Sequence, residues 1–304
     1  MTTESVPCPD CRGLAKQLGA ISATDTFAGR RLDKPLAGGS LYRCLHCSLG
    51  FRWPRLSKGE LDALYAQGSD FTWAEAGNAR RDWHIARDWI RQSVPKGHRI
   101  LDVGCFDGGF LAPFVAEYGC SGIEIHPAAS QRARQKSIDI LGNDFSAVSG
   151  SFDVVTAFDV IEHVERPGQF LEDCLAATNR HGYVLISSGN LDAASFRLMG
   201  SRYWYCTIGE HVSFVSPRWF LINAAATQYE IVRQATFIHG DARWSRRVRD
   251  AGVNLAYRFG GAGFRALRRL GMGGKAVTAN PELTDHPPGW LSAKDHFMVL
   301  VQKR

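Results

Sequence analysis

The sequence has no long hydrophobic run and no leader-like N-terminus. Its apolar stretches fall short of the roughly 20 residues that a membrane-spanning helix needs, so we do not expect a transmembrane protein. The opening residues MTTESVPCPDC contain neither the basic segment nor the apolar segment of a secretory signal. We therefore expect a cytoplasmic protein, in which thiols stay reduced and disulfide bonds are uncommon.

The sequence also lacks a general excess of basic charge. Its net charge is +6, but residues 241–275 contain nine Lys and Arg against two Asp, a local charge of +7 that leaves −1 for the rest. No stripe of aromatic and basic residues suits the stacking of single-stranded bases. We therefore do not expect nucleic acid as a partner. The 304 residues are enough for an α/β core and a small additional module.

Four of the eight cysteines form two Cys-x-x-Cys pairs near the N-terminus. Four thiolates are what a closed tetrahedral zinc site requires, and each pair lies in a short turn that can direct both sulfurs at one ion. The alternatives are two unrelated thiol pairs or a redox motif, although a redox motif needs only one pair beside a βαβ unit. We predict a zinc ribbon over residues 1–55, with structural Zn²⁺ bound by Cys8, Cys11, Cys44 and Cys47.

Strands and helices alternate along most of the remaining chain. Residues 56–97 predict a helical linker, in which Ser57 and Glu60 form a capping box. From residue 98 onward, buried-strand patterns alternate with helical patterns, including a helix expected at 108–119. This alternation favours an α/β fold with a doubly wound parallel sheet. We expect this domain to cover residues 98–304 and to carry a basic amphipathic insertion at 241–290.

The insertion has one apolar helical face among its arginines. That face contains Trp244, Val248, Leu255, Phe259, Ala262, Ala266 and Leu270. We expect it to pack on the sheet as a lid, with the arginines in solvent. Two alternatives stay open for residues 241–275: a peripheral membrane helix that meets a lipid-linked glycan, and a patch that contacts nucleic-acid phosphates.

A glycine-rich loop, LDVGCFDGGF, follows the first strand of the expected sheet. A dinucleotide fingerprint would read G-x-G-x-x-G, but here Gly104 is followed by Gly108 and Gly109, so the middle glycine is missing. Glu124 ends the second strand, 20 residues after Gly104, where it can accept hydrogen bonds from ribose hydroxyls. The loop alone therefore fits a dinucleotide or another adenosine ligand.

Four stretches in order resemble the class I S-adenosylmethionine-dependent methyltransferases over residues 80–240. They are LDVGCFDGGF, the acid in GIEIHP, SFDVVTAFDVIEHVERPGQFL and GYVLISSGN. The resemblance implies a seven-stranded, mostly parallel sheet whose last strand is antiparallel, and S-adenosyl-L-methionine as the cofactor. It implies cofactor binding by Asp102, Gly104, Cys105, Phe106, Asp107, Gly108, Glu124, Asn143, Asp144 and Phe158.

Within this set, the loop from Asp102 to Gly108 would hold the methionine end of the cofactor. Glu124 would hold the ribose, and Asn143 and Asp144 would lie near the adenine. Because the sulfonium is a cation without phosphate, acids at the loop suit it better than a phosphate nest. Phe106 stands where the family usually has glycine, so its side chain must point away from the cofactor or cover it.

Catalysis of methyl transfer needs a base for the proton of the acceptor. The candidates are Asp159, Glu162, His163, Glu210 and His211. They resemble the Glu-x-x-Glu-His metal site of ubiquinone-pathway O-methyltransferases and small-RNA 3′-end methyltransferases, with Asp159 replacing the first Glu. We favour the alternative that Glu162 and His163 orient the following loop without a metal, and that His211 is the base.

A zinc ribbon ahead of a methyltransferase domain also resembles bacterial sugar methyltransferases of polysaccharide and deoxysugar pathways. Members that methylate carbon carry a further C-terminal domain that this shorter chain lacks. We therefore expect O-methylation of a sugar or a similar small hydroxylated acceptor. The alternatives are methylation of RNA or another nucleic acid, and a zinc-ribbon protein that only binds. The oligomeric state stays open.

Overall fold

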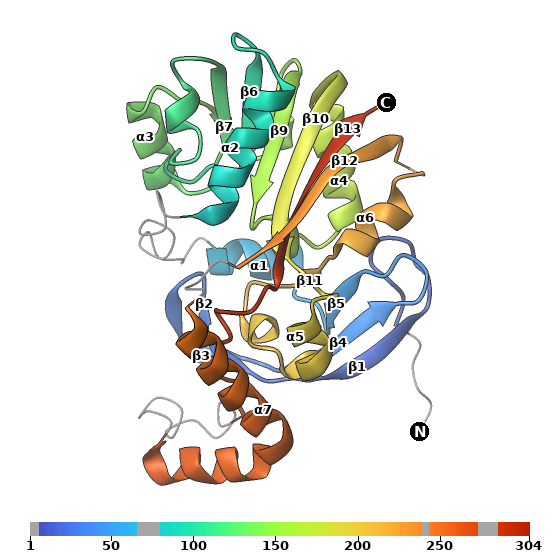
Figure 1. Cartoon of the computed structure of the whole chain (residues 1–304), viewed down its shortest axis with the longest axis vertical. Coiled ribbons are helices and arrows are strands. Elements are labelled where there is room, and N and C mark those ends of the chain that lie inside the picture. The colour runs from blue at the N-terminus through green and yellow to red at the C-terminus, as the bar shows by residue number, and fades with distance from the viewer. Residues whose placement is uncertain (1–5, 66–79, 226, 239–242, 273–284) are drawn as a thin grey trace. The chain divides into compact units, whose positions relative to one another are not determined.

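The computed structural model describes residues 6–65, 80–225, 227–238, 243–272 and 285–304, and the chain groups into two compact units (Figure 1). We call the first unit the ribbon unit; it comprises Met1–Gly68, Asn190–Phe214 and Ile238–Asp295. We call the second the sheet unit; it comprises Ser69–Gly189, Val215–Phe237 and His296–Arg304.

The sheet unit contains a seven-stranded sheet in the order β12-β13-β10-β9-β6-β7-β8. Its strands are β6 (Arg99–Val103), β7 (Gly119–Ile123), β8 (Asp139–Gly142), β9 (Phe152–Phe158), β10 (Thr178–Gly189), β12 (Tyr229–Phe237) and β13 (His296–Lys303). Only β13 runs antiparallel to its neighbours. The predicted seven-stranded, mostly parallel, doubly wound sheet is confirmed. The order of strands reverses at β6, which is where such sheets bind ligands.

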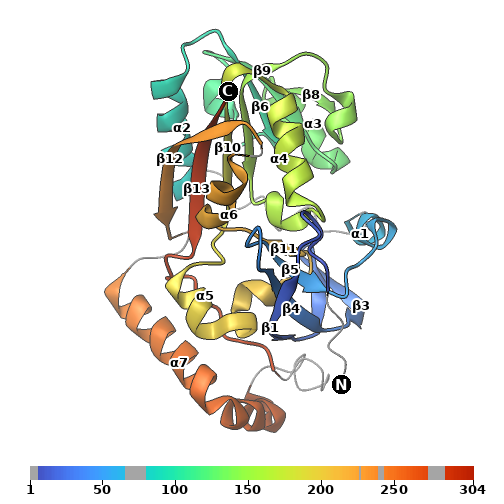
Figure 2. The ribbon, with the colours of Figure 1, turned by 90° about the vertical axis from the view of Figure 1, so that its right-hand side faces the viewer.

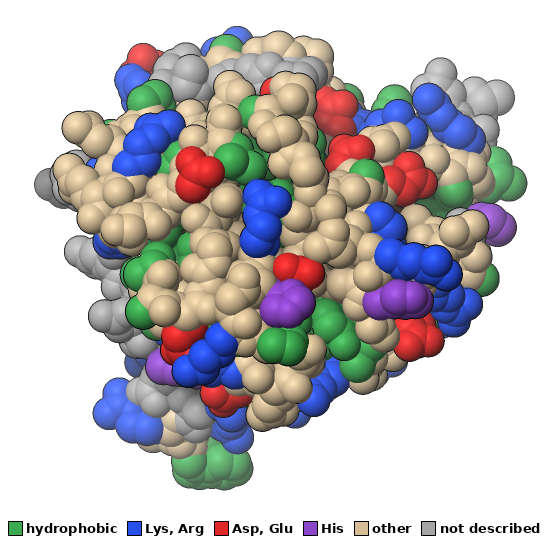
Figure 3. All heavy atoms as spheres, turned by 90° about the horizontal axis from the view of Figure 1, so that it is seen from above, with side chains coloured by type: hydrophobic (Ala, Val, Ile, Leu, Met, Phe, Trp, Pro, Cys, Tyr) green, Lys and Arg blue, Asp and Glu red, His purple; other side chains and the backbone are tan. Residues whose placement is uncertain are grey.

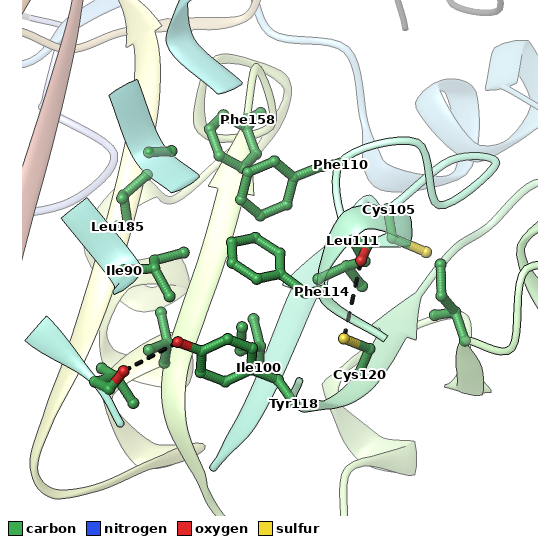
Figure 4. Close-up of a cluster of buried hydrophobic side chains, with 14 of the residues drawn as sticks. Ile90, Ile100, Cys105, Phe110, Leu111, Phe114, Tyr118, Cys120, Phe158 and Leu185 are labelled. Carbon is green, nitrogen blue, oxygen red and sulfur yellow. Dashed lines mark hydrogen bonds between the residues drawn. The ribbon is translucent and has the colours of Figure 1, made fainter. Parts of the chain in front are cut away.

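One face of this sheet is closed by a dense aromatic core (Figure 4). The Phe110 ring lies 4.4 Å from that of Phe158 and 5.7 Å from that of Phe114, centroid to centroid. Helix α2 (Arg81–Ser93) adds Ala86 and Ile90 to the core. Aromatic side chains of this size dominate core energetics because each removes a large apolar area from water. The loop after β6 therefore rests on a rigid support.

Three other helices of the sheet unit begin at prolines. They are α3 (Pro127–Gln135), α4 (Pro167–Ala176) and α6 (Pro217–Asn223). Proline is suited to the first helical position because its missing N–H would have no partner there. The helix predicted at 108–119 is wrong: the structure has only a 3₁₀ turn, η2 (Ala112–Phe114), among other turns. Pro113 cannot donate the bond that would continue an α-helix from the turn before it.

The ribbon unit contains a four-stranded sheet in the order β1-β4-β5-β11, and the hairpin β2–β3. These elements are β1 (Ala15–Ile21), β2 (Thr24–Phe27), β3 (Arg30–Leu36), β4 (Gly39–Cys44), β5 (Gly50–Trp53) and β11 (Ser213–Phe214). The segment after β10 contributes β11 and α5 (Ala194–Met199). The buried guanidinium of Arg52 donates to the carbonyls of Cys206 (3.0 Å) and Gly209 (3.3 Å).

The structure therefore divides the chain differently from the predicted ranges 1–55, 56–97 and 98–304. The two helices of the predicted linker bury their apolar faces in different cores. Helix α1 (Lys58–Tyr65) places Leu61 against Phe27 and Val212 in the ribbon unit, whereas α2 packs in the sheet unit. The Ser57–Glu60 capping box is confirmed: Ser57 N donates to Glu60 Oε2 at 2.7 Å.

Figures 1 and 2 show the course of helix α7 (Trp244–Leu267). The side chains of the face that we expected to be buried are exposed. Trp244 is 78% exposed and Phe259 is 77% exposed. The buried side chains are instead Asp250, Asn254 and Tyr257, which hydrogen-bond within the ribbon unit. The prediction of an apolar lid packed on the sheet is therefore wrong. Residues 241–242 and 273–284 of the predicted insertion lie outside the described residues. Among the described helices, none is long and apolar enough to cross a membrane.

The face of the molecule shown in Figure 3 carries acidic and basic side chains side by side. At the amino ends of the sheet strands, Lys96 pairs with Glu117 at 2.9 Å and His98 contacts Asp153 at 3.1 Å. Exposed pairs of this kind add little stability. Among the side chains that Figure 3 shows, charges of both signs are interspersed, unlike the continuous basic surface that follows a phosphate backbone.

Candidate functional site

The loop between β6 and β7 adopts a backbone that favours glycine. Gly104 and Gly108 have φ angles of 71° and 75°, a region that side chains rarely enter. A Cβ atom at Gly108 would lie 2.1 Å from Ile138 Cδ1. Phe106 shares this conformation, with φ at 48°. Its ring lies under the Arg132 guanidinium, 5.4 Å from the centroid.

Glu124 ties this loop to the helix that follows β7. Its Oε2 accepts a hydrogen bond from Phe106 N and its Oε1 accepts one from His126 N, both at 2.7 Å. Burial raises the pKa of this carboxyl, and the two backbone N–H groups act in the opposite direction. Each carboxylate oxygen has a second lone pair, so Glu124 can hold the loop and still accept from ribose hydroxyls.

Asp102 is the buried acid at the end of β6. Thr156 Oγ1 donates to Asp102 Oδ1 at 2.6 Å. Burial raises the pKa of Asp102 to about 7, against the opposing effects of Thr156 and Arg80. Asp107 differs, because Lys136 Nζ lies 2.5 Å from its Oδ2 and neutralises it. Of the two acids expected to face a cationic ligand, Asp107 is therefore already paired, and Asp102 is only partly ionised near neutral pH.

The order of strands aligns the remaining cofactor candidates along one edge. Because β6, β7 and β8 are parallel neighbours, their carboxyl ends lie side by side. Asn143 and Asp144 follow β8, and both are exposed. Asp144 Oδ1 accepts from Ser146 N at 2.8 Å and so begins the 3₁₀ turn η3 (Phe145–Ala147). The glycine loop, Glu124 and this pair therefore follow one another along the edge.

Two predicted cofactor residues place their side chains in the core instead (Figure 4). Cys105 Sγ packs over Gly122, where a Cβ would lie only 2.4 Å from it. The Phe158 ring packs against that of Phe110 at a tilted angle. Cys105 can thus offer a ligand only backbone groups, and Phe158 supports the loop from below.

Sequence reasoning missed a buried ion-pair network at the same edge. Arg80 Nη2 lies 2.6 Å from Asp82 Oδ2 and 2.6 Å from Asp159 Oδ2. Burial lowers the pKa of Arg80, but the two carboxylates raise it by more. Trp83, under the Arg80 cation, has a buried Nε1 without a hydrogen-bond partner among the described residues. An acid in the first turn of a helix is so common that Asp82 gave no separate signal.

Glu162 and His163 lie in a 3₁₀ turn, η4 (Ile161–His163), just after β9. Glu162 is buried, and Ser188 Oγ donates to its Oε2 at 2.9 Å. His163 is partly exposed. Both residues belong to the sheet unit, in the segment where parallel strands present catalytic groups.

His211 belongs to the ribbon unit and is buried just before β11. Its Nδ1 donates to the Tyr205 carbonyl at 3.1 Å, and the two rings lie 4.1 Å apart, centroid to centroid. Because a carbonyl can only accept, Nδ1 carries the proton and Nε2 is the basic nitrogen. Glu210, the other candidate in this segment, is partly exposed.

The sulfur atoms of the four paired cysteines lie close together, as predicted. They all lie within 4.8 Å of one another. Cys8 and Cys47 are 3.6 Å apart and Cys11 and Cys44 are 3.4 Å apart, sulfur to sulfur. Sulfurs bound tetrahedrally to one zinc at about 2.3 Å are separated by roughly 3.8 Å. The donor set and its spacing fit Zn²⁺.

The two cysteine turns repeat the same backbone geometry. Cys8 N donates to Gly13 O at 2.9 Å, and Cys44 N donates to Leu49 O at 2.8 Å, five residues on in each case. A residue with positive φ, Arg12 or Ser48, follows each pair. A Cβ at Gly13 would lie 3.3 Å from Cys11 Sγ, so glycine keeps the space around the sulfurs open.

Comparison with known proteins gives a consistent result. A family model described as a methyltransferase domain matches residues 77–234, just over half of the chain. The ubiquinone biosynthesis O-methyltransferase of Thiobacillus denitrificans is 35% identical over 130 residues, which cover 38% of this chain and 56% of that protein. The protein of the same name from Azorhizobium caulinodans is 28% identical over 189 residues, covering 56% and 74%.

These matches cover only part of each protein. The chain spans about half the length of the Thiobacillus denitrificans protein and of the proteins of the same name from Ralstonia nicotianae and Leptothrix cholodnii. Among solved structures, a chain of the complex between the Haloferax volcanii Trm112 methyltransferase activator and a methyltransferase aligns with a TM-score of 0.51 and 16% identity. The alignment covers 80% of this chain and 97% of that one, which shows a shared fold.

Proposed function

Because the chain belongs to the methyltransferase domain family, with S-adenosylmethionine as cofactor, we propose that it transfers the cofactor's methyl group to a hydroxyl oxygen of a small acceptor. The observation that carries this proposal is the glycine loop held by Glu124, beside the buried acid Asp102. The relatives named O-methyltransferases support oxygen as the acceptor atom.

The edge of the sheet offers what each part of this cofactor requires. The positive φ angles of Gly104 and Gly108 shape the loop that would hold the methionine end, and Glu124 would accept from the ribose hydroxyls. Asn143 and Asp144 lie where an adenine would follow. The bound cofactor supplies a methyl group on a positively charged sulfur, and the ionised form of Asp102 suits that charge.

The remaining chemistry is positioning and proton removal. In this proposal the acceptor oxygen bonds to the methyl carbon as the carbon–sulfur bond breaks, and the electron pair of that bond stays on sulfur. His211 Nε2 takes the hydroxyl proton. Glu162 and His163 orient the loop that follows them, without a metal. Asp159 Oδ2 is engaged by Arg80, which supports a structural role for that acid.

For the acceptor we propose a sugar or glycan precursor, as the zinc ribbon suggests. An acceptor from ubiquinone biosynthesis is the second candidate, because the relatives carry that name. Nucleic acid is no part of the proposal. None of the eight cysteines forms a disulfide bond in the structure, which supports the cytoplasmic location that we propose. Transfer of labelled methyl to sugar, quinol-type and RNA acceptors, measured side by side, tests the choice; transfer to RNA alone would overturn it.

We expect Glu124→Ala to weaken binding of S-adenosylhomocysteine by about 10- to 150-fold in isothermal titration. Losing hydrogen bonds to a charged group costs about 1.5–3 kcal/mol. Glu230→Ala, which removes an exposed acid at the start of β12, should leave the affinity unchanged. Glu124→Gln should lose less than Glu124→Ala, because its amide oxygen still accepts from the loop. Equal affinity in the folded Ala variant, or wild-type binding of NAD instead, would refute the assignment.

We expect binding of S-adenosylmethionine to tighten as pH rises through about 7, the raised pKa of Asp102. The ionised carboxylate attracts the cationic sulfur, whereas S-adenosylhomocysteine has a neutral sulfur and should respond less. The ratio of the two affinities, measured from pH 6 to 8, isolates this effect, and Asp102→Asn should flatten it. The stability of the ligand-free protein should change in the opposite direction. Because the pKa of Asp102 is higher in the folded than in the unfolded state, this group stabilises the fold at pH values below its unfolded pKa. That contribution to the free energy of unfolding is lost as pH rises through about 7.

A further inference from the structure

Helix α7 presents an apolar stripe to solvent. We define the exposed stripe as Trp244, Val248, Leu255 and Phe259, which recur on one face of the helix because they are spaced by four and seven residues. All four side chains are exposed. Beyond the bend at Gly260, Leu270 is exposed as well. Large apolar side chains that gather on a surface in this way mark a binding surface.

The opposite side of α7 is fixed to the ribbon unit by polar groups. Ser292 Oγ donates to Asp250 Oδ2 at 2.8 Å, and Tyr257 OH donates to the Asp285 carbonyl at 2.9 Å. This buried side lies about 140° around the helix from the exposed stripe, at 100° per residue. A core-packed helix buries its apolar side and exposes its polar side; α7 does the reverse.

Basic side chains flank the exposed stripe. Residues 244–272 contain seven arginines and one acid, Asp250, for a net charge of +6. Two of the arginines, Arg246 and Arg249, pair with Asp250. By helical geometry Arg247 and Arg258 lie at the border of the stripe, and the Arg258 guanidinium is 5.8 Å from the Phe259 ring centroid.

A cavity of about 700 Å³ in the ribbon unit adds further positive charge. Its lining includes Arg197, Arg202 and Arg258, together with Leu198, Ser201 and Asp285. Arg258 Nε donates to the Leu198 carbonyl at 3.0 Å. In the described part of the chain, no carboxylate pairs with any of these three guanidinium groups. Because Arg258 also borders the exposed stripe, the cavity and the stripe adjoin.

We propose that α7 and this cavity bind the surface of a membrane that contains anionic lipids. The exposed stripe enters the boundary between headgroups and acyl chains, as interfacial helices do. The arginines contact lipid phosphates, whose geometry suits a guanidinium. A symmetric second copy would set two arginine-rich helices against each other, and a nucleic acid would leave the aromatic and aliphatic stripe in water. This proposal is independent of the acceptor proposed above.

Vesicle flotation with the full chain tests the proposal. We expect binding to vesicles of phosphatidylglycerol and phosphatidylcholine, weaker binding to phosphatidylcholine alone, and a fall in binding as salt rises. Trp244→Ser/Phe259→Ser should reduce binding to the mixed vesicles by roughly tenfold or more, since it removes two large apolar anchors. Leu221→Ser/Ile222→Ser, on an exposed face of α6 in the sheet unit, should bind like wild type.

Three further measurements separate the alternatives. The zinc content of the Trp244/Phe259 variant should equal that of wild type, which shows that the ribbon unit, to which α7 belongs, is folded. Arg202→Gln/Arg258→Gln should reduce binding to mixed vesicles and leave binding to phosphatidylcholine unchanged. Equal binding to both kinds of vesicle, a wild-type dimer that the Trp244/Phe259 variant abolishes, or retained vesicle binding by that variant would overturn the proposal.

Discussion

Cys44→Ser/Cys47→Ser should lose its zinc and unfold the ribbon unit. Metal analysis should find one zinc per wild-type chain and none in the variant. Zinc binding to four thiolates contributes about 10–16 kcal/mol in small zinc modules, which is as large as the whole free energy of unfolding of a typical domain, about 5–15 kcal/mol. Limited proteolysis and circular dichroism would report the loss of structure.

The control for this variant is Cys206→Ser, which alters a buried cysteine of the same unit outside the metal cluster. It should keep its zinc. S-adenosylhomocysteine binding should survive in the Cys44/Cys47 variant, because the proposed cofactor residues belong to the sheet unit. Equal zinc in the variant and wild type would show that the cysteine pairs do not hold the metal.

His211→Ala should cut turnover by about 10²- to 10⁴-fold, the usual cost of removing a general base, with S-adenosylhomocysteine affinity nearly unchanged. The hydrogen bond from Nδ1 to the Tyr205 carbonyl fixes the tautomer that leaves Nε2 basic. His98→Ala is the matched control, since His98 lies at the amino end of β6. An unaltered rate in His211→Ala, or a loss of cofactor binding in place of rate, would remove His211 as the base.

Activity should also survive treatment with EDTA, provided that metal analysis shows the ribbon zinc to be retained. Loss of activity that Mg²⁺ or Mn²⁺ restores, with zinc content constant, would contradict the metal-free mechanism. Asp159, Glu162, His163 and His211 would then be the candidate ligands, and the Arg80–Asp159 ion pair would have to rearrange.

The features that could be predicted from the sequence are those formed by residues close together in the chain. The glycine loop, Glu124 and the cysteine turns each lie within a few residues of the pattern that reveals them. The Arg80–Asp82–Asp159 network joins residues 79 positions apart, so only the fold brings it together. For α7, the sequence correctly shows which residues form the apolar stripe. Whether that stripe faces the protein or the solvent depends on Ser292 and Asp285, whose hydrogen bonds hold the polar face of the helix against the ribbon unit. Periodicity does not show which face a helix buries.

The position of β13 determines when the seven-stranded sheet can form during synthesis. β13 consists of residues 296–303, yet it lies between β10 and β12 and pairs with both. On the ribosome, these two earlier strands therefore expose unpaired edges until residues 296–303 have been made. Unpaired edges invite aggregation. Emergence of β13 from the ribosome is then the event that joins the two edges, and a nascent chain stalled before residue 296 would be a substrate for chaperones.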